Sequence, residues 1–303
     1  MSVVVEKLSK HYGAQKAMDE VSFTARKGEI VGLLGPNGAG KTTTMKILTC
    51  FIPQTKGSAT VCDFDVNKNP IEVRKRIGYL PEHNPLYKEM YIKEYLSFIA
   101  GLYNIKNKSA RVAEMIEMVG LEKEQHKKIQ ALSKGYRQRV GLAQSMMHDP
   151  EVLILDEPTS GLDPNQLAEI RGLIKSIGQE KTVIFSSHIM QEVQAICDKV
   201  VIINNGKLVA NDSIDKLQVT STKSQSVLIE LKQALPEKLL KNNPKIHAIK
   251  SLGDKKYRII GDKKIDLREL VFNFAVENKI TLLQLNLEKT SVEDVFQELT
   301  KKK

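Results

Sequence analysis

Long apolar runs are missing from this sequence. The longest ones, such as residues 152–155 and 200–203, have the length of a β-strand and fall far short of the ~18 to 20 residues that a membrane span needs. Residues 1–7 also lack the basic start, apolar segment and cleavage site of a secretory signal. The sequence therefore predicts a cytoplasmic protein, and work at a membrane would require another chain to span it.

Cysteine is scarce as well. Cys50, Cys62 and Cys197 are an odd number of thiols and lack the spacing of metal ligands. This excludes a disulfide framework and gives no sign of a zinc site, so we expect the three thiols to be buried apolar side chains.

The composition is that of a folded globular protein. Apolar residues make up 41% and charged residues 27% of the 303 residues, and this length predicts about two domains. The net charge of +10 is uneven, because residues 218–303 contain 17 basic and 11 acidic residues. A basic segment can bind nucleic acid or an anionic membrane. Because no long basic cluster and no aromatic-basic alternation is present, we favour a lysine-rich solvated surface and expect no nucleic-acid partner.

Residues 1–217 predict an α/β domain with a largely parallel sheet. Short β-branched runs alternate there with helical patterns, and the expected strands cover residues 3–5, 29–34, 152–155, 182–185 and 200–203. Over residues 88–148 the strand signal disappears and apolar residues recur at helical spacing, as at Ile92, Leu96 and Ile99. The pattern predicts a helical subdomain that interrupts the α/β core.

Residues 218–303 predict a separate small α+β domain. The polar stretch 218–226 marks the boundary. After it we expect strand, helix, strand, strand, helix, strand and a last helix, at residues 227–231, around 237, 246–249, 257–260, 267–275, 281–287 and 291–299. This order is the ferredoxin-like arrangement with one additional helix. Nothing in it suggests a catalytic site.

Residues 35–42 match the phosphate-loop pattern G-x-x-x-x-G-K-[ST] between an expected strand and an expected helix. Glycines let the backbone curl so that N–H groups face phosphate oxygens, and the helix N-terminus adds positive potential. Lys41 can reach the β- and γ-phosphates of ATP, and the hydroxyl of Thr42 can bind Mg²⁺. The predicted phosphate-binding residues are Gly35, Pro36, Asn37, Gly38, Ala39, Gly40, Lys41, Thr42 and Thr43.

The run 152–157 is apolar and then doubly acidic, as expected for a buried strand that ends at a site. Asp156 is suited to position magnesium, usually through water, and Glu157 to polarise the attacking water. An exposed acidic turn is the alternative interpretation, which the neighbouring phosphate loop disfavours.

Residues 132–139, Leu-Ser-Lys-Gly-Tyr-Arg-Gln-Arg, complete a set of five motifs with residues 35–42, 153–157, 161–163 and His188. In this order the motifs resemble the nucleotide-binding domain of ATP-binding cassette (ABC) proteins over residues 3–217. The resemblance implies a P-loop ATPase that uses ATP and Mg²⁺. It also implies a head-to-tail homodimer with two shared ATP sites.

The resemblance assigns roles to five further positions. Ser133 and Gly135 would contact the γ-phosphate of ATP held by the other subunit, and Asp163 belongs to the loop that crosses the dimer interface. Tyr12 would stack on adenine, His188 would contact the γ-phosphate, and both would line the ATP site. For single residues the simpler interpretations are a helix cap for Ser133 and an exposed turn for Tyr12.

Two departures from the family pattern stand out. Glu82 occupies a position that is usually glutamine, where it would contact nucleotide, water or magnesium, although a solvated loop residue is the alternative. Lys134 and Tyr136 replace the usual glycine and glutamine but leave Ser133 and Gly135 intact.

The chain looks like the ATPase subunit of an ABC-2-type bacterial exporter, with separate integral membrane permease subunits, at the cytoplasmic face of the inner membrane. Residues 163–166 and 291–296 carry this resemblance, and residues 81–87 look like the subunit associated with gliding motility in Bacteroidota. A soluble ABC ATPase acting on nucleic acid or ribosomes and an ATP-gated regulator are the rival classes. The transported substrate cannot be read from these residues.

Overall fold

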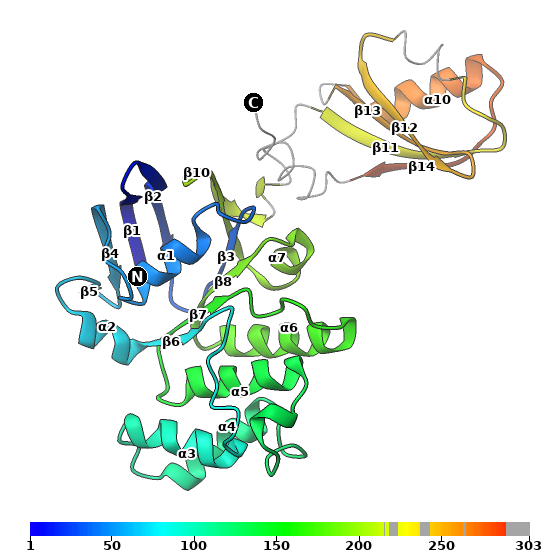
Figure 1. Cartoon of the computed structure of the whole chain (residues 1–303). Helices are drawn as coiled ribbons and strands as arrows, with labels where there is room; N and C mark the ends of the chain where they lie inside the picture. Colours follow the sequence, from blue (N-terminus) through cyan, green and yellow to red (C-terminus); the bar gives the residue numbers. More distant parts are fainter. Residues whose placement is uncertain (215, 218–223, 237–242, 263–264, 289–303) are drawn as a thin grey trace. The chain divides into compact units, whose positions relative to one another are not determined.

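The computed structural model describes residues 1–214, 216–217, 224–236, 243–262 and 265–288. The chain divides into two compact units, Met1–Ser213 and Ile214–Lys303 (Figure 1). The boundary that the sequence predicts, between residues 217 and 218, lies a few residues after this division. Among the described residues, no helix combines the length and the apolar character that crossing a membrane requires.

A six-stranded sheet forms the centre of the first unit. Its order is β10 (Lys207–Ser213), β9 (Lys199–Asn204), β3 (Ile30–Leu34), β8 (Thr182–Ser187), β7 (Val152–Asp156) and β6 (Ile77–Leu80). All neighbours are parallel except β10 and β9. Every residue of β3, β7 and β8 is buried, because a parallel sheet is covered on both faces. The predicted parallel sheet is thus confirmed.

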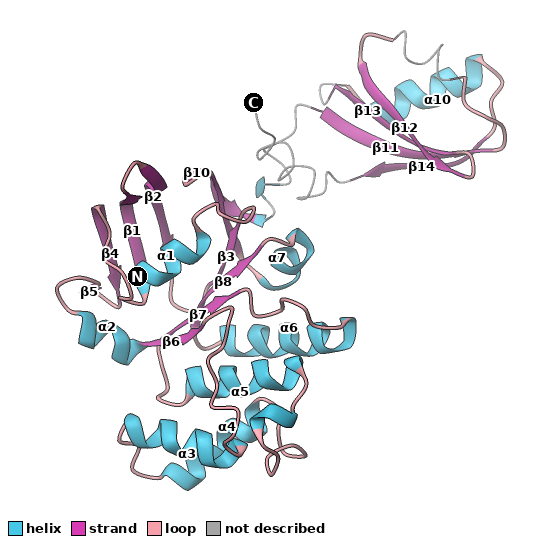
Figure 2. Cartoon of the chain, viewed as in Figure 1, coloured by secondary structure: helices cyan, strands magenta, loops and turns pink. Residues whose placement is uncertain are grey.

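A second, antiparallel sheet corrects one expectation. β1 (Val3–Tyr12) belongs to the order β2 (Gln15–Ala25), β1, β4 (Lys56–Val61) and β5 (Phe64–Asp65), and not to the parallel sheet. Helix α1 (Lys41–Leu48) contacts strands of both sheets, and Figure 2 shows it between them. Its buried Met45 and Ile47 share one core with Val5 and Leu33. This packing holds the end of the phosphate loop rigidly.

Helices occupy the segment where the sequence predicts them. After α2 (Pro70–Arg76) and β6, the chain forms α3 (Ile92–Leu102), α4 (Lys108–Met118), a 3₁₀ turn (Ile129–Ala131) and α5 (Lys134–Met146). The Tyr95 hydroxyl of α3 donates a hydrogen bond to Gln144 of α5 at 2.6 Å, and Arg111 of α4 donates to the carbonyls of Met146 and Met147. α6 (Pro164–Gly178) and α7 (Met190–Ile196) return the chain to the sheet.

The second unit contains a four-stranded antiparallel sheet of order β12 (Ile246–Gly253), β13 (Lys256–Asp262), β11 (Ser224–Leu231) and β14 (Leu282–Glu288). Helix α10 (Leu267–Glu277) packs on it through Leu267 and Val271, against Val227 and Ile259. The four strands and this helix confirm the predicted elements. The helices expected around residue 237 and over 291–299 lie outside the described residues.

The cysteines are free thiols, as expected, but only Cys197 is buried. Cys50 and Cys62 are half-buried at turns with a positive φ. They are therefore not the core side chains that the sequence suggests.

Candidate nucleotide-binding and catalytic site

A cavity of about 790 Å³ opens where β3, β7 and β8 end. Its lining brings together most of the residues that the sequence singles out: Tyr12, Asn37, Gly38, Ala39, Gly40, Lys41, Thr42, Thr43, Glu82, Glu157 and His188. Ligands of parallel sheets bind beyond the carboxyl ends of the strands. The cavity therefore has the position and the size for a nucleotide.

The phosphate loop leads directly into α1. Gly40 is the N-cap of this helix, with φ 111°, and it offers no side chain to bond the first backbone N–H groups. A Cβ at Gly40 would lie 2.8 Å from the carbonyl oxygen of Ala17, so only glycine fits. No acidic residue occupies the first turn of α1. The helix start therefore presents N–H donors and positive potential to an anion.

Lys41 is a buried cation at the base of the cavity. Its side chain is 6% exposed, and its Nζ donates to the carbonyl of Gly35 at 2.7 Å and lies 3.4 Å from that of Pro36. The same Nζ lies 3.5 Å from Oε1 of Glu157. Carbonyls and one carboxylate thus compensate the charge of Lys41.

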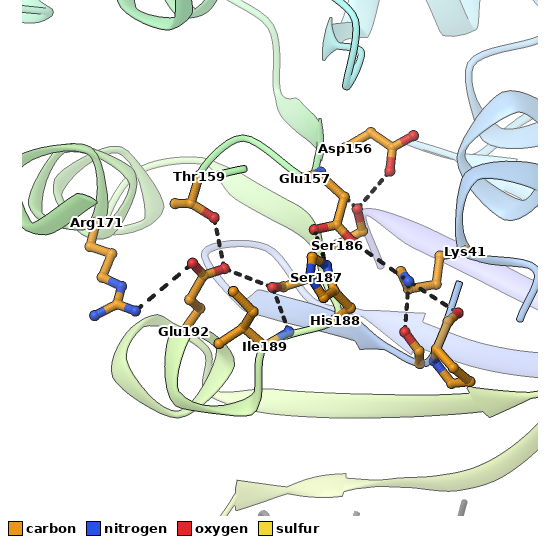
Figure 3. A network of polar contacts seen from close by, with 12 residues as sticks. Lys41, Asp156, Glu157, Thr159, Arg171, Ser186, Ser187, His188, Ile189 and Glu192 are labelled. Atoms are coloured by element: carbon orange, nitrogen blue, oxygen red, sulfur yellow. Dashed lines mark hydrogen bonds and ion pairs between the residues drawn. The ribbon is translucent and has the colours of Figure 1, made fainter. Parts of the chain in front are cut away.

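The acidic pair lies at the end of β7, where its backbone is tightly held (Figure 3). Asp156 is 1% and Glu157 6% exposed. The hydroxyl of Ser186 on β8 donates to Oδ1 of Asp156 at 2.6 Å and accepts from the N–H of Glu157 at 2.9 Å. Glu157 has φ 48°, an uncommon conformation for a non-glycine residue, which is retained where the surroundings impose it. This geometry aims the carboxylate at the cavity.

His188 follows β8 and meets the same carboxylate. Its Nδ1 lies 2.9 Å from Oε2 of Glu157, and its side chain is 45% exposed. Glu157 therefore contacts Lys41 through one oxygen and His188 through the other. A carboxylate held in this way can orient a water molecule and accept its proton.

Six predicted residues do not line this cavity: Gly35, Pro36, Asp156, Ser133, Gly135 and Asp163. The last three lie at the starts of α5 and α6. Ser133 caps α5, accepting from the N–H of Tyr136 at 3.3 Å, and Asp163 caps α6, accepting from the backbone of two following residues. Gly135 is buried, and a Cβ there would lie 2.5 Å from the side chain of Gln166 on α6. Lys134 approaches Gly161 in the loop before α6. The loop of Ser133 therefore lies beside the loop that ends at Asp163, and neither Ser133 nor Asp163 is part of the cavity lining.

Comparisons with known proteins agree with this arrangement. The family model described as ABC transporter matches residues 18–160. Bacitracin transport ATP-binding protein BcrA of Bacillus licheniformis is 35% identical over 304 residues, which cover 99% of this chain and 98% of that protein. ABC transporter ATP-binding protein NatA of Bacillus subtilis is 39% identical over 67% of this chain and 84% of its own length. The chain belongs to the ABC transporter ATP-binding proteins.

A solved structure supports the same fold. The structure of cbiO1 from Clostridium perfringens, part of the ABC transporter complex cbiONQ, superposes with a TM-score of 0.66 at 27% identity, over 72% of this chain and 91% of that one. The first unit is thus the P-loop cassette of an ABC ATPase.

Several residues of the ABC cassette line the cavity without having been predicted. They are Gln15, Lys16, Ala17, Ser160, Asn205 and Gly206. Asn205 and Gly206 form the tight turn between β9 and β10, with φ 49° and 74°. An Asn-Gly pair directly after the β-branched run 200–203 and Asn204 is a hairpin signal that could have located this turn. Nothing local connects the turn to a phosphate loop more than 160 residues earlier.

The donors of the ABC cassette fit a magnesium ion bound together with phosphate. The hydroxyl of Thr42 lines the cavity, and Asp156 forms no ion pair in the described part of the chain. Burial, and then the negative charges of Asp156 and Glu82, raise the pKa of Tyr79 to about 12. Mg²⁺ prefers oxygen ligands and usually takes phosphate oxygens and water as well. No group of three or more acidic, histidine or cysteine side chains gathers among the described residues.

Proposed function

We propose that this ABC ATPase powers export of a substrate through separate membrane-spanning subunits. The observation that carries the proposal is the cavity in which the phosphate loop faces Glu157 and His188. BcrA is named for bacitracin transport, and its similarity extends over 99% of this chain. From this proposal it follows that the protein acts at the cytoplasmic face of the bacterial inner membrane.

Hydrolysis would proceed by in-line attack of water on the γ-phosphate. The N–H groups at the start of α1 and the ammonium of Lys41 hold the phosphates, while Tyr12 at the rim stacks on adenine. Glu157 orients the water and accepts its proton as the new phosphorus–oxygen bond forms and the bond to ADP breaks. His188 holds Oε2 of Glu157 in place and reaches the γ-phosphate. Bound Mg²⁺, held by Thr42 and Asp156 with Glu82 nearby, would supply charge stabilisation.

A head-to-tail homodimer completes the site in this proposal. Ser133, Gly135 and Asp163 lie away from the cavity of their own chain, which supports their use by a second copy. A subunit with Lys41→Ala mixed with one carrying Ser133→Arg retains at most one intact composite site per dimer. We expect partial recovery of ATPase activity from this mixture, whereas each variant by itself is inactive. Wild-type rates in the mixture would contradict the shared site.

An apolar groove on the first unit suits the membrane subunits. Its volume is about 360 Å³, and Phe51, Leu102 and Tyr103 at its rim are 70%, 63% and 45% exposed. Arg74 adds one cation to the lining. A short apolar helix with an acidic residue, presented by a membrane subunit, fits this chemistry. Phe51→Glu should abolish co-purification with the membrane subunits and leave ATP binding unchanged, with the exposed Ile71→Glu as the matched control.

We propose that Glu82 transmits events at the γ-phosphate to these partners. It lines the nucleotide cavity directly after β6 and before the helical segment. An ionised carboxylate accepts hydrogen bonds but, unlike an amide, donates none. Glu82→Gln should keep or raise basal ATPase activity, while Glu82→Ala should uncouple hydrolysis from transport. Unchanged coupling in the alanine variant would indicate a solvated loop residue.

The second unit, from about residue 218, is proposed to be a ferredoxin-like regulatory or dimer-stabilising domain. Numbered within the unit, its strand order 2-3-1-4 with all neighbours antiparallel supports this arrangement, as does the place of α10 between β13 and β14. The gliding-motility assignment based on residues 81–87 stays a prediction. Identification of the membrane proteins that purify with the full chain would decide it.

The direct test of the export proposal is whether ATP hydrolysis drives transport only when those membrane proteins are present. When the full chain is reconstituted in vesicles with its co-purified partners, substrate should move across the membrane, from the side that contains ATP to the opposite side. If instead the chain purifies with ribosomes or nucleic acid and without a membrane protein, the soluble class of ABC ATPase is correct.

A further inference from the structure

Glu192 is a buried carboxylate close to the nucleotide site but outside its cavity. It lies on α7 and is 1% exposed. Its Oε2 accepts two hydrogen bonds, from the hydroxyl of Thr159 at 2.7 Å and from the hydroxyl of Ser187 at 2.7 Å (Figure 3). Thr159 and Ser187 are themselves buried. A single oxygen therefore joins two segments that are far apart in the sequence.

These two segments carry the groups that face the γ-phosphate side of the cavity. Thr159 lies two residues after Glu157 and one before Ser160, which lines the cavity. Ser187 directly precedes His188, and its Oγ also accepts from the N–H of Ile189 at 3.0 Å. The turn that presents His188 is thereby fixed from both sides. Glu192 thus links the segment of Glu157 to the segment of His188.

The charge of Glu192 is poorly compensated for so buried a group. Its nearest cation is Arg171 on α6, with Nη2 4.0 Å from Oε1. Oε1 of Glu192 and Nε of Arg171 lack a hydrogen-bond partner among the described residues. Burying an ion pair seldom stabilises a protein more than apolar side chains of the same volume would. Stability alone therefore gives little reason for a carboxylate at this place.

We propose that Glu192 is a positioning residue for ATP hydrolysis. By accepting hydrogen bonds from both Thr159 and Ser187, it keeps Glu157 and His188 in fixed positions relative to each other. The inference rests on the proposed roles of Glu157 and His188. It predicts that loss of the carboxylate slows the chemical step and leaves nucleotide affinity nearly intact, because Lys41 and the phosphate loop do not contact Glu192. A residue needed only for folding would lower the measured rate through the amount of active protein and leave KM unchanged, so kcat is calculated per ATP-binding site counted by titration. Per site, such a residue would leave kcat at the wild-type value.

The test compares Glu192→Met with Glu192→Gln in the purified full chain. Methionine fills the volume without accepting hydrogen bonds, whereas the amide oxygen of glutamine can still accept from both hydroxyls. We expect kcat to fall about tenfold or more in Glu192→Met, with the KM for ATP changed less than about threefold, and to return to within about threefold of wild type in Glu192→Gln. Glu114→Met, which removes an exposed carboxylate paired with Arg111, is the control and should leave kcat unchanged.

Two single-hydroxyl variants keep the test decisive if Glu192→Met fails to fold. Thr159→Val and Ser187→Ala should each lower kcat, and the double variant should lose less than the product of the two separate losses, because both hydroxyls donate to the same oxygen. Wild-type kcat in both hydroxyl variants, or in a folded Glu192→Met, would overturn the inference. Glu157→Gln is measured beside them. If it hydrolyses ATP at the wild-type rate, the proposed site itself is wrong, whatever the Glu192 variants do.

Discussion

Replacing Glu157 by glutamine tests the proposed chemistry most directly. The amide has nearly the same shape as the carboxylate, and it removes one negative charge and the ability to take a proton from water. The N–H groups at the start of α1 and the N-cap Gly40 are set by the backbone, and Nζ of Lys41 keeps its hydrogen bond to the carbonyl of Gly35. We therefore expect Glu157→Gln to bind ATP with an affinity close to that of the wild type.

The expected loss of turnover follows from the geometry of the carboxylate. Oε2 lies 2.9 Å from Nδ1 of His188 and Oε1 3.5 Å from Nζ of Lys41, so two side chains hold the carboxylate in one orientation. General base catalysis by a positioned side chain contributes about 10²- to 10⁴-fold. At about 1.4 kcal/mol for each factor of ten, this corresponds to about 3 to 5 kcal/mol of the activation barrier.

Steady-state ATPase rates and equilibrium ATP titration on the same preparations measure the two effects separately. With hydrolysis slowed, Glu157→Gln should accumulate an ATP-bound dimer, which light scattering detects. Glu72→Gln serves as the matched control, because it also replaces a glutamate that pairs with cations, here the exposed Glu72 with Lys75 and Arg76. A kcat within about threefold of wild type in Glu157→Gln would refute the assignment of the general base.

Three further predictions concern the loop, the second unit and the pH dependence of stability. Gly40→Ala should weaken ATP binding and lower the Tm, because its φ of 111° and the 2.8 Å approach of a Cβ to the carbonyl of Ala17 strain the loop by about 1–3 kcal/mol. Ile229 is 1% exposed, so Ile229→Ala should destabilise the second unit by about 2–5 kcal/mol in urea unfolding and leave the affinity for ATP unchanged. A chain that ends at residue 217 should likewise still bind ATP. Burial lowers the pKa of His148, so the unfolded state binds more protons. The free energy of unfolding should therefore fall as the pH drops below about 6.5, and His148→Phe should weaken this dependence.

Features whose residues are neighbours along the chain could be predicted without the structure. The phosphate loop at 35–42 could be predicted because a strand, a glycine-rich turn and a helix follow one another, and the structure has β3, this turn and α1 there. The buried strand ending at Asp156 and Glu157 was equally clear, since five apolar or acidic positions in succession are all buried in β7. Helical periodicity likewise predicted α3 and α4, and the sequence also predicted the four strands of the second unit.

Only the tertiary structure decided which of these segments meet. The sequence did not place β1 in a separate antiparallel sheet, because a short apolar strand fits either kind of sheet and its partners β2 and β4 are chosen by packing on α1. It likewise did not connect Asn205 and Gly206 to the phosphate loop, although their turn lines the same cavity.

The clearest case is Glu192. As a residue of a short amphipathic helix it resembles any solvated glutamate, and its burial depends on two hydroxyls and an arginine brought together by β8, α6 and the loop after β7. A local sequence pattern predicts the secondary structure and the apolar face of a single segment only. Contacts between distant segments depend on how whole elements pack, and that is settled by the burial of the entire core.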